Sequence, residues 1–121
     1  MRDGTRSAHP NALPNYQNAI IPRDKLERYL LNPAHPEGKH KGIVFKSALG
    51  FEQSDWKMLR DSIADGLPYH ETLLGRTDKY GTRYNVTMPI TGANGRTVDV
   101  LTAWIVATGN EYPSFVTALV I

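Results

Sequence analysis

The fold of this 121-residue chain is decided by the stretch TRYNVTMPITGANGRTVDVLTAWIVAT, residues 82–108. Two segments rich in β-branched and aromatic residues, 82–90 and 96–108, flank the turn sequence TGANGR, and its Asn-Gly pair is the strongest short signal for a β-hairpin. Apolar residues alternate onto both sides of the second segment. The sequence therefore predicts an antiparallel hairpin and leaves open which face meets the rest of the core.

Outward from this hairpin, residues 71–76 and 113–121 have the same strand-like composition, so we expect a four-stranded antiparallel sheet. The first half of the chain instead shows apolar residues at helical spacing between turn signals. This spacing predicts three helices, over residues 22–32, 39–50 and 55–66. Helices followed by an antiparallel meander define an α+β fold in which about three N-terminal helices pack on the sheet.

The domain organisation follows from length and composition. Residues 1–18 are rich in Pro, Asn, Gly and charge without periodicity, which predicts a flexible or extended N-terminal arm. Residues 19–121 have the length of a single domain with one core. No apolar run reaches membrane-spanning length and no signal-peptide pattern is present, so we expect a soluble chain acting in the cytoplasm.

Net charge, cysteine content and histidine spacing limit which ligands and cofactors the chain can be expected to use. The formal net charge is only +2, so any argument for nucleic acid depends on local clusters. The chain has no cysteine, which excludes a disulfide framework and a thiolate nucleophile. Its four histidines form no metal-binding pair on a helix face, and no nucleotide-cofactor motif occurs. We expect neither a metal nor a cofactor.

The remaining polar residues suit cleavage of RNA without a metal. That reaction uses the RNA 2′-hydroxyl as nucleophile and needs a base, an acid and donors for the charged phosphorane. His35 can exchange a proton near neutral pH, and Lys41 lies where a helix begins and favours anions. Tyr80, Arg83 and Thr102 add two hydroxyls and a guanidinium. If these five residues form a catalytic site, they must converge on one cleft between sheet and helices.

Each candidate also has a structural interpretation. His35 fits a loop residue that bonds the backbone, and Arg83 fits a surface ion pair with Asp78. Trp104 fits the core, and the run Lys39–Lys41 fits a solvated helix start. Sequence alone leaves these alternatives open.

Four blocks together resemble a known family. They are YLLNPAHPEGKHKGIVFKSALGF (29–51), GRTDKYGTRYNVTMPITGANGR (75–96), VLTAWIV (100–106) and PSFVTALVI (113–121). Their order is similar to that of the C-terminal toxin domain of contact-dependent growth inhibition proteins and its free-standing bacterial and phage relatives. That domain belongs to the barnase, EndoU, colicin and RelE-like ribonuclease group. The resemblance runs from about Leu13 to Ile121, and residues 31–51 are its most specific part.

The resemblance implies a metal-independent endoribonuclease toxin, often acting on tRNA, that a cognate immunity or antitoxin protein neutralises. We expect that partner to be acidic, and the cleaved RNA to carry a 2′,3′-cyclic phosphate. A non-catalytic module of the same fold that binds RNA or a partner is the alternative. The chain begins at Met1 without a secreted carrier, which fits a free-standing protein or an excised fragment.

The family's site elements can be carried over by position. The resemblance places catalytic roles on His35, Lys41, Tyr80, Arg83 and Thr102. RNA binding is expected at Lys39, His40, Tyr84 and Trp104.

Overall fold

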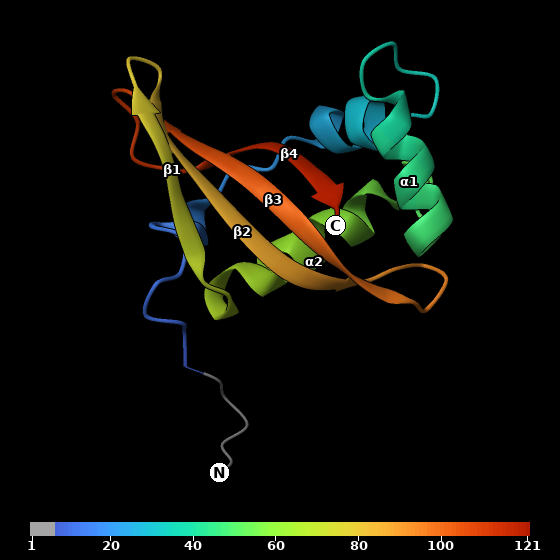
Figure 1. Ribbon diagram of the computed structural model, residues 1–121, viewed down its shortest axis with the longest axis horizontal. Helices are drawn as coiled ribbons and strands as arrows, with labels where there is room; N and C mark the ends of the chain where they lie inside the picture. Colours follow the sequence, from blue (N-terminus) through green and yellow to red (C-terminus); the bar gives the residue numbers. More distant parts are fainter. Residues whose placement is uncertain (1–6) are drawn as a thin grey trace.

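A four-stranded antiparallel sheet in the order β1-β2-β3-β4 forms the body of the computed structural model, which describes residues 7–121 (Figure 1). All three neighbouring pairs are antiparallel, which confirms the expected meander. The longest pairing joins β2 and β3 across the Asn-Gly hairpin, as expected. The strands are β1 (Thr72–Asp78), β2 (Gly81–Thr91), β3 (Thr97–Ala107) and β4 (Ser114–Val120).

Three helices precede the sheet, so the α+β fold class is confirmed. They are η2 (Lys25–Leu30), α1 (Lys39–Leu49) and α2 (Trp56–Gly66). The first helix differs in type from a regular α-helix, because η2 is a π-helix in which the amide of Leu31 donates to the carbonyl of Leu26 at 2.9 Å. Short 3₁₀ turns complete the elements at η1 (Tyr16–Asn18), η3 (Gln53–Asp55) and η4 (Leu67–Tyr69).

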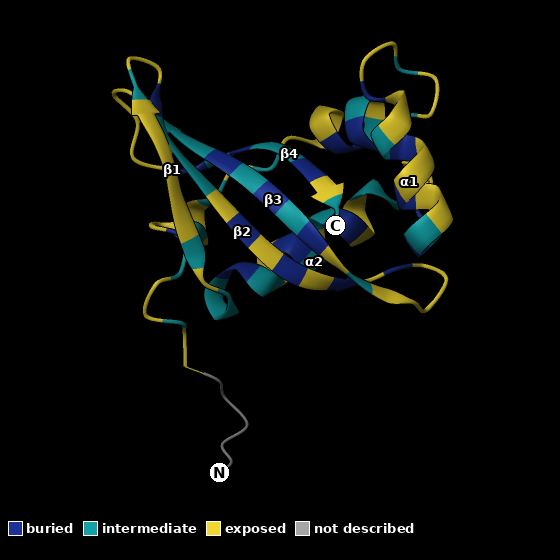
Figure 2. Cartoon of the chain, viewed as in Figure 1, coloured by how far each residue is buried: buried dark blue, intermediate teal, exposed yellow. Residues whose placement is uncertain are grey.

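One face of the β2–β3 hairpin packs on the helices. Val100, Thr102 and Trp104 are buried, whereas Leu101 and Ala103 between them are only partly covered. Figure 2 shows the resulting alternation of buried and more exposed bands along β2 and β3. The even-numbered face of β3 is therefore the core face. Its partners in the hydrophobic core come from every helix and from the other long strands: Leu26, Leu30, Phe45, Leu49, Leu59, Ile63, Val86, Met88, Ile90 and Phe115.

A short chain of hydrogen bonds crosses this core. The indole N–H of Trp104 donates to Oγ1 of Thr102 at 2.8 Å, and that hydroxyl donates to the carbonyl of Val86 at 2.8 Å. Thr102 is fully buried, and the ring of Trp104 packs edge-on against Phe115 at 5.5 Å between centroids. Because each polar atom has a partner, the pair can be buried without the cost of an unsatisfied group.

Two glycines let α1 fit against its surroundings. Gly42 is buried, and a Cβ at this position would lie 3.1 Å from the carbonyl oxygen of Asn32, so a larger residue would require the preceding loop to shift slightly. Gly50 ends α1 with a left-handed φ of 70°, as the sequence predicts, and its amide donates to the carbonyl of Lys46.

The described part of the expected N-terminal arm, residues 7–18, runs along the sheet and η4. The amide of His9 donates to the carbonyl of Pro68 at 2.7 Å, and the carbonyl of Asn11 accepts from the amide of Thr72 at 2.8 Å. Leu13 is buried in the core. Residues 7–18 are thus anchored by backbone bonds and one core side chain, and residues 1–6 lie outside the described part.

Thr102→Val should lower the free energy of unfolding by about 1–3 kcal/mol, because it leaves the indole N–H of Trp104 buried without an acceptor. Urea unfolding at neutral pH measures the change. Thr117→Val is the matched control, since its buried hydroxyl has no hydrogen-bond partner among residues 7–121. Equal losses in the two variants would contradict the importance of the Thr102–Trp104 bond.

Candidate functional site

Basic residues occupy the N-terminal end of α1. Gly38 precedes the helix without a side-chain cap, and Lys39, His40 and Lys41 form its first turn, which contains no acidic residue. Within residues 7–121, neither lysine forms an ion pair. Because the N-terminal end of a helix already carries partial positive charge, these cations repel it and one another. A bound anion would relieve that repulsion.

The loop before α1 holds His35 in one orientation. Its Nδ1 atom accepts hydrogen bonds from the backbone amides of Glu37 at 3.0 Å and Gly38 at 2.9 Å. In the neutral ring the hydrogen must therefore lie on Nε2. His35 in this conformation offers a hydrogen-bond donor at Nε2. Its lone pair lies on Nδ1, where the two amides of Glu37 and Gly38 already donate.

Tyr29 from η2 joins His35 to Lys41. Its ring meets the ring of His35 edge-on, with centroids 5.1 Å apart and planes at 84°. The ammonium of Lys41 lies 3.4 Å from the Tyr29 hydroxyl oxygen and 5.7 Å from the ring centroid. Three side chains from η2, the loop and α1 thus form one cluster, named here the Tyr29 cluster. Sequence reasoning missed Tyr29 as a site residue because its helical spacing with Leu26 and Leu30 marked it only as part of an amphipathic face.

Lys39 and His40 lie at the edge of the Tyr29 cluster and are exposed. The ring of His40 has no hydrogen-bond partner among residues 7–121. Of the two histidines near Lys41, His40 is therefore the one whose ring nitrogens are both without a hydrogen-bond partner within residues 7–121.

Tyr80 and Arg83 lie in a second polar group at the tip of the β1–β2 hairpin. Figure 1 places this tip at the opposite end of the molecule from α1. The carboxylate of Asp78 organises the tip, accepting from the amide of Tyr80 at 2.9 Å and pairing with Arg76 at 3.1 Å and Arg83 at 3.7 Å. The surface ion pair of Arg83 with Asp78, one of the alternatives left open by the sequence, is confirmed.

The bond from the Tyr80 amide is the main reason that the pKa of Asp78 lies below its ordinary value. The charges of Arg83 and Arg76 lower this pKa further, and partial desolvation acts in the opposite direction.

The remaining candidates face the core. Thr102 is fully buried with its hydroxyl engaged on both sides, and Trp104 is buried beside it. Tyr84, which pairs with Trp104 across the strands, packs partly buried against the same core. A phosphate could reach the hydroxyl of Thr102 only if the core opened.

The five catalytic candidates are therefore divided among three places. His35 and Lys41 meet at Tyr29, Tyr80 and Arg83 lie at the far hairpin tip, and Thr102 is buried in the core. The structure does not bring these five residues into one cleft, because the strand length of the sheet separates the two surface groups. The geometry supports a site only at the Tyr29 cluster.

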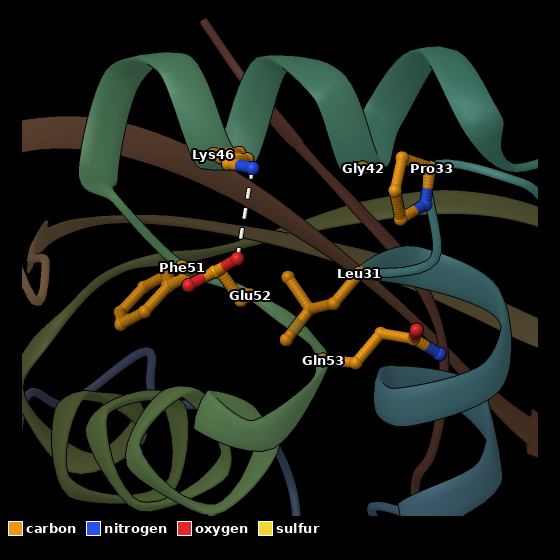
Figure 3. Close-up of a pocket in the computed structure, with 7 residues that line it drawn as sticks. All are labelled: Leu31, Pro33, Gly42, Lys46, Phe51, Glu52 and Gln53. Carbon is orange, nitrogen blue, oxygen red and sulfur yellow. Dashed lines mark ion pairs between the residues drawn. The ribbon is translucent and has the colours of Figure 1, made fainter.

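A hollow of about 100 Å³ lies between α1, η2 and the segment before η3 (Figure 3). Leu31 and Phe51 form its buried walls, and the ion pair of Lys46 with Glu52 at 3.6 Å closes one side. Each charge here already has a partner, so this hollow is a packing gap between helices. No group of three potential metal-ligating side chains occurs within residues 7–121. None of the helices found in that part of the chain has the length and apolar character to cross a bilayer.

The fold is shared with a solved structure. The chain is similar to a chain in the "Contact-dependent growth inhibition toxin - immunity protein complex from Klebsiella pneumoniae 342", with a TM-score of 0.65 and 13% sequence identity. The similarity covers 88% of this chain and 96% of that chain, and it shows a common fold. No curated protein is similar enough in sequence to count as a match. The family model for a domain of unknown function, DUF6883, matches residues 12–121, so the chain belongs to that family.

The orientation of His35 leads to a testable difference between two histidines. His35 should carry its hydrogen on Nε2, whereas His70 should carry it on Nδ1, because that atom lies 2.8 Å from the carbonyl of Gly66, which can only accept. Long-range ¹H–¹⁵N NMR correlation at a pH of about 8.5, where ordinary imidazoles are neutral, distinguishes the two tautomers. The same tautomer at both positions would contradict the described loop.

Asp78→Asn should lower the melting temperature at pH 7, because the lowered pKa means that the ionised carboxylate stabilises the folded chain. The unfolded chain binds more protons at this residue than the folded chain, so the contribution is lost as the pH falls through the lowered pKa. The difference between parent and variant should therefore shrink in acid. Thermal unfolding followed by circular dichroism from pH 7 downward measures it, and a difference that grows toward acid would refute the assignment.

Proposed function

We propose that the chain is a toxin-type, metal-independent endoribonuclease domain whose phosphate site is the Tyr29 cluster. One observation carries the proposal: the ammonium of Lys41 and the ring of His35 both contact Tyr29 at the start of a helix that has no acidic residue in its first turn. The fold shared with a chain of a toxin–immunity complex supports the toxin class. Transfer RNA is the substrate that we propose to test first.

The cluster suits the electrostatic part of RNA transesterification. When the 2′-hydroxyl oxygen attacks phosphorus, negative charge grows on the phosphorane oxygens before the bond to the 5′-oxygen breaks. Lys41 neutralises that charge, and the Nε2–H of His35 donates to a phosphate oxygen. Tyr29 positions both side chains. The products are a 2′,3′-cyclic phosphate and a free 5′-hydroxyl.

Proton transfer falls to His40 in this proposal. His35 is held by the two amides that point at Nδ1, so it acts as a fixed donor and not as an acid or base. His40 neighbours Lys41 on α1, is exposed, and its ring has no hydrogen-bond partner within residues 7–121. In this proposal its ring takes the proton from the 2′-hydroxyl and then gives a proton to the departing 5′-oxygen. A general base of this kind typically contributes about 10²–10⁴-fold to the rate. The role that the sequence pattern suggested for His35 thus passes to the next histidine along the chain.

The same surface supports an acidic protein partner. Lys39, His40 and Lys41 have no carboxylate partner within residues 7–121, so a protein that supplies carboxylates would compensate them and block access of RNA. The similar solved chain comes from a complex that contains an immunity protein, which agrees with this proposal.

Lys41→Ala should lower the rate of tRNA cleavage by about 10²–10³-fold, because it removes the cation closest to the developing charge. The assay follows purified protein and tRNA in EDTA, with end-group analysis for the cyclic phosphate. Lys57→Ala removes the same charge from an exposed position on α2 and should keep the parent rate. A parent that needs a divalent cation would overturn the metal-independent mechanism. Binding of tRNA without cleavage would favour the non-catalytic alternative.

His40→Ala and His35→Asn should affect the pH–rate profile differently. Loss of His40 should flatten the limb near neutral pH, since it removes the proposed base. His35→Asn places a side-chain oxygen where Nδ1 accepts the two amides, so the loop is kept while the Nε2 donor is lost. That variant should be slower with an unchanged profile. If the pH–rate profile near neutral pH is flattened in His35→Asn and unchanged in His40→Ala, His35 and not His40 is the general base.

A further inference from the structure

Two hollows lie on either side of the contact between Lys41 and Tyr29. The first, of about 330 Å³, is lined by Asp24, Lys25, Tyr29 and Val116. The second, of about 150 Å³, is lined by His40, Lys41, Val44, Phe45, Leu119 and Val120. Tyr29 belongs to the first hollow and Lys41 to the second, and their polar atoms are 3.4 Å apart. Both hollows also border β4, at Val116 and at Val120, about 13 Å apart along an extended strand.

The walls of both hollows are mainly apolar. In the second hollow the aliphatic side chains of Val44 and Leu119 remain 44% and 40% exposed, although each lies beside a buried core residue, Phe45 or Ala118. In the first hollow Val116 and the ring of Tyr29 face the space. Its two charged residues are already engaged, since Asp24 pairs with Arg28 at 3.6 Å and the ammonium of Lys25 donates to the carbonyl of Phe115 at 3.0 Å. A flat ligand with apolar faces would suit these walls better than a second phosphate.

Nucleobases have those properties. Proteins that bind single-stranded RNA hold unstacked bases against side chains while cations hold the backbone. A phosphate at Lys41 and Tyr29 would place its two neighbouring nucleotides on opposite sides of that contact, where the hollows lie.

We infer that the two hollows are base subsites on either side of the scissile phosphate, so the substrate is a single-stranded RNA segment with at least two unstacked bases. The inference rests on the proposed phosphate site at the Tyr29 cluster. Double-stranded RNA does not fit, because its paired and stacked bases cannot enter separate hollows. Within tRNA, the subsites select a loop or the unpaired 3′ end.

An oligonucleotide without the reactive hydroxyl tests the subsites without cleavage. Fluorescence anisotropy compares a single-stranded oligodeoxynucleotide with an abasic oligomer of the same length, in EDTA at low salt. Both probes carry the same phosphates, so the difference in affinity reports the bases. The parent should bind the base-containing probe at least about tenfold more tightly.

The double variant Val44→Ala/Leu119→Ala removes the exposed walls of the second hollow. It should lower this preference to about threefold or less and leave the affinity for the abasic probe unchanged. Both residues are partly exposed, so the fold should persist, and circular dichroism checks this. The matched control is Leu73→Ala/Leu74→Ala, which truncates two exposed leucines of β1 and should keep the parent preference.

The outcomes separate this inference from the proposed catalysis. Equal binding of both probes by the parent, or an unchanged preference in the Val44/Leu119 variant, overturns the base subsites even if tRNA is cleaved. A preference that depends on Val44 and Leu119, in a parent that fails to cleave tRNA, supports the subsites and overturns the ribonuclease. Binding of neither probe, in a parent that also fails to cleave tRNA, overturns both proposals.

Discussion

The buried hydrogen-bond chain from Trp104 through Thr102 to Val86 is the constraint on which the rest of the structure depends. A polar group in a core is tolerated only when its partner is fixed in place, so the chain ties the register of β2 and β3 to the orientation of the indole. A shift of one residue between β2 and β3 would move Thr102 and Trp104 together to the other face and separate the hydroxyl of Thr102 from the carbonyl of Val86. The hydrogen-bond chain therefore holds β2 and β3 in the register that presents Thr102 and Trp104 to the helices.

The face on which the helices pack determines where polar side chains can gather at the surface. Helices packed on one side of a meander leave their ends and the hairpin turns as the places where polar side chains gather. At one end, the loop between η2 and α1 brings Tyr29, His35 and Lys41 together. At the other, the β1–β2 turn collects arginines around Asp78. The two groups lie apart, because the tip of the β1–β2 hairpin and α1 are at opposite ends of the molecule (Figure 1).

Most of the fold could be predicted from the sequence, because period-two alternation, the Asn-Gly turn and helical apolar spacing are local signals. The π-helical form of η2 could not, since the additional residue in its turn depends on how Leu26 and Leu30 both reach the core.

The site was harder to predict. His35 and Lys41 are close in sequence and stay close in space, but the burial of Thr102 and Trp104 depended on which face of β3 the helices cover. That choice is made by tertiary packing, and no pattern within the strand reveals it. Tyr29 was missed for a related reason. Its spacing with Leu26 and Leu30 predicted only a buried helix face, whereas in the structure its hydroxyl lies next to the ammonium of Lys41.

Charge compensation explains why only one of the two basic ends remains suited to an anion. At the hairpin tip the carboxylate of Asp78 already pairs with Arg76 and Arg83, and its lowered pKa shows that it stays ionised at neutral pH. An arriving phosphate would have to compete with that carboxylate for the same guanidinium groups. At α1 the lysines have no such competitor within residues 7–121, and the helix end adds its own positive potential. Although the two groups contain similar residues, Asp78 compensates the cations at the tip, whereas the lysines at the start of α1 have no carboxylate partner within residues 7–121.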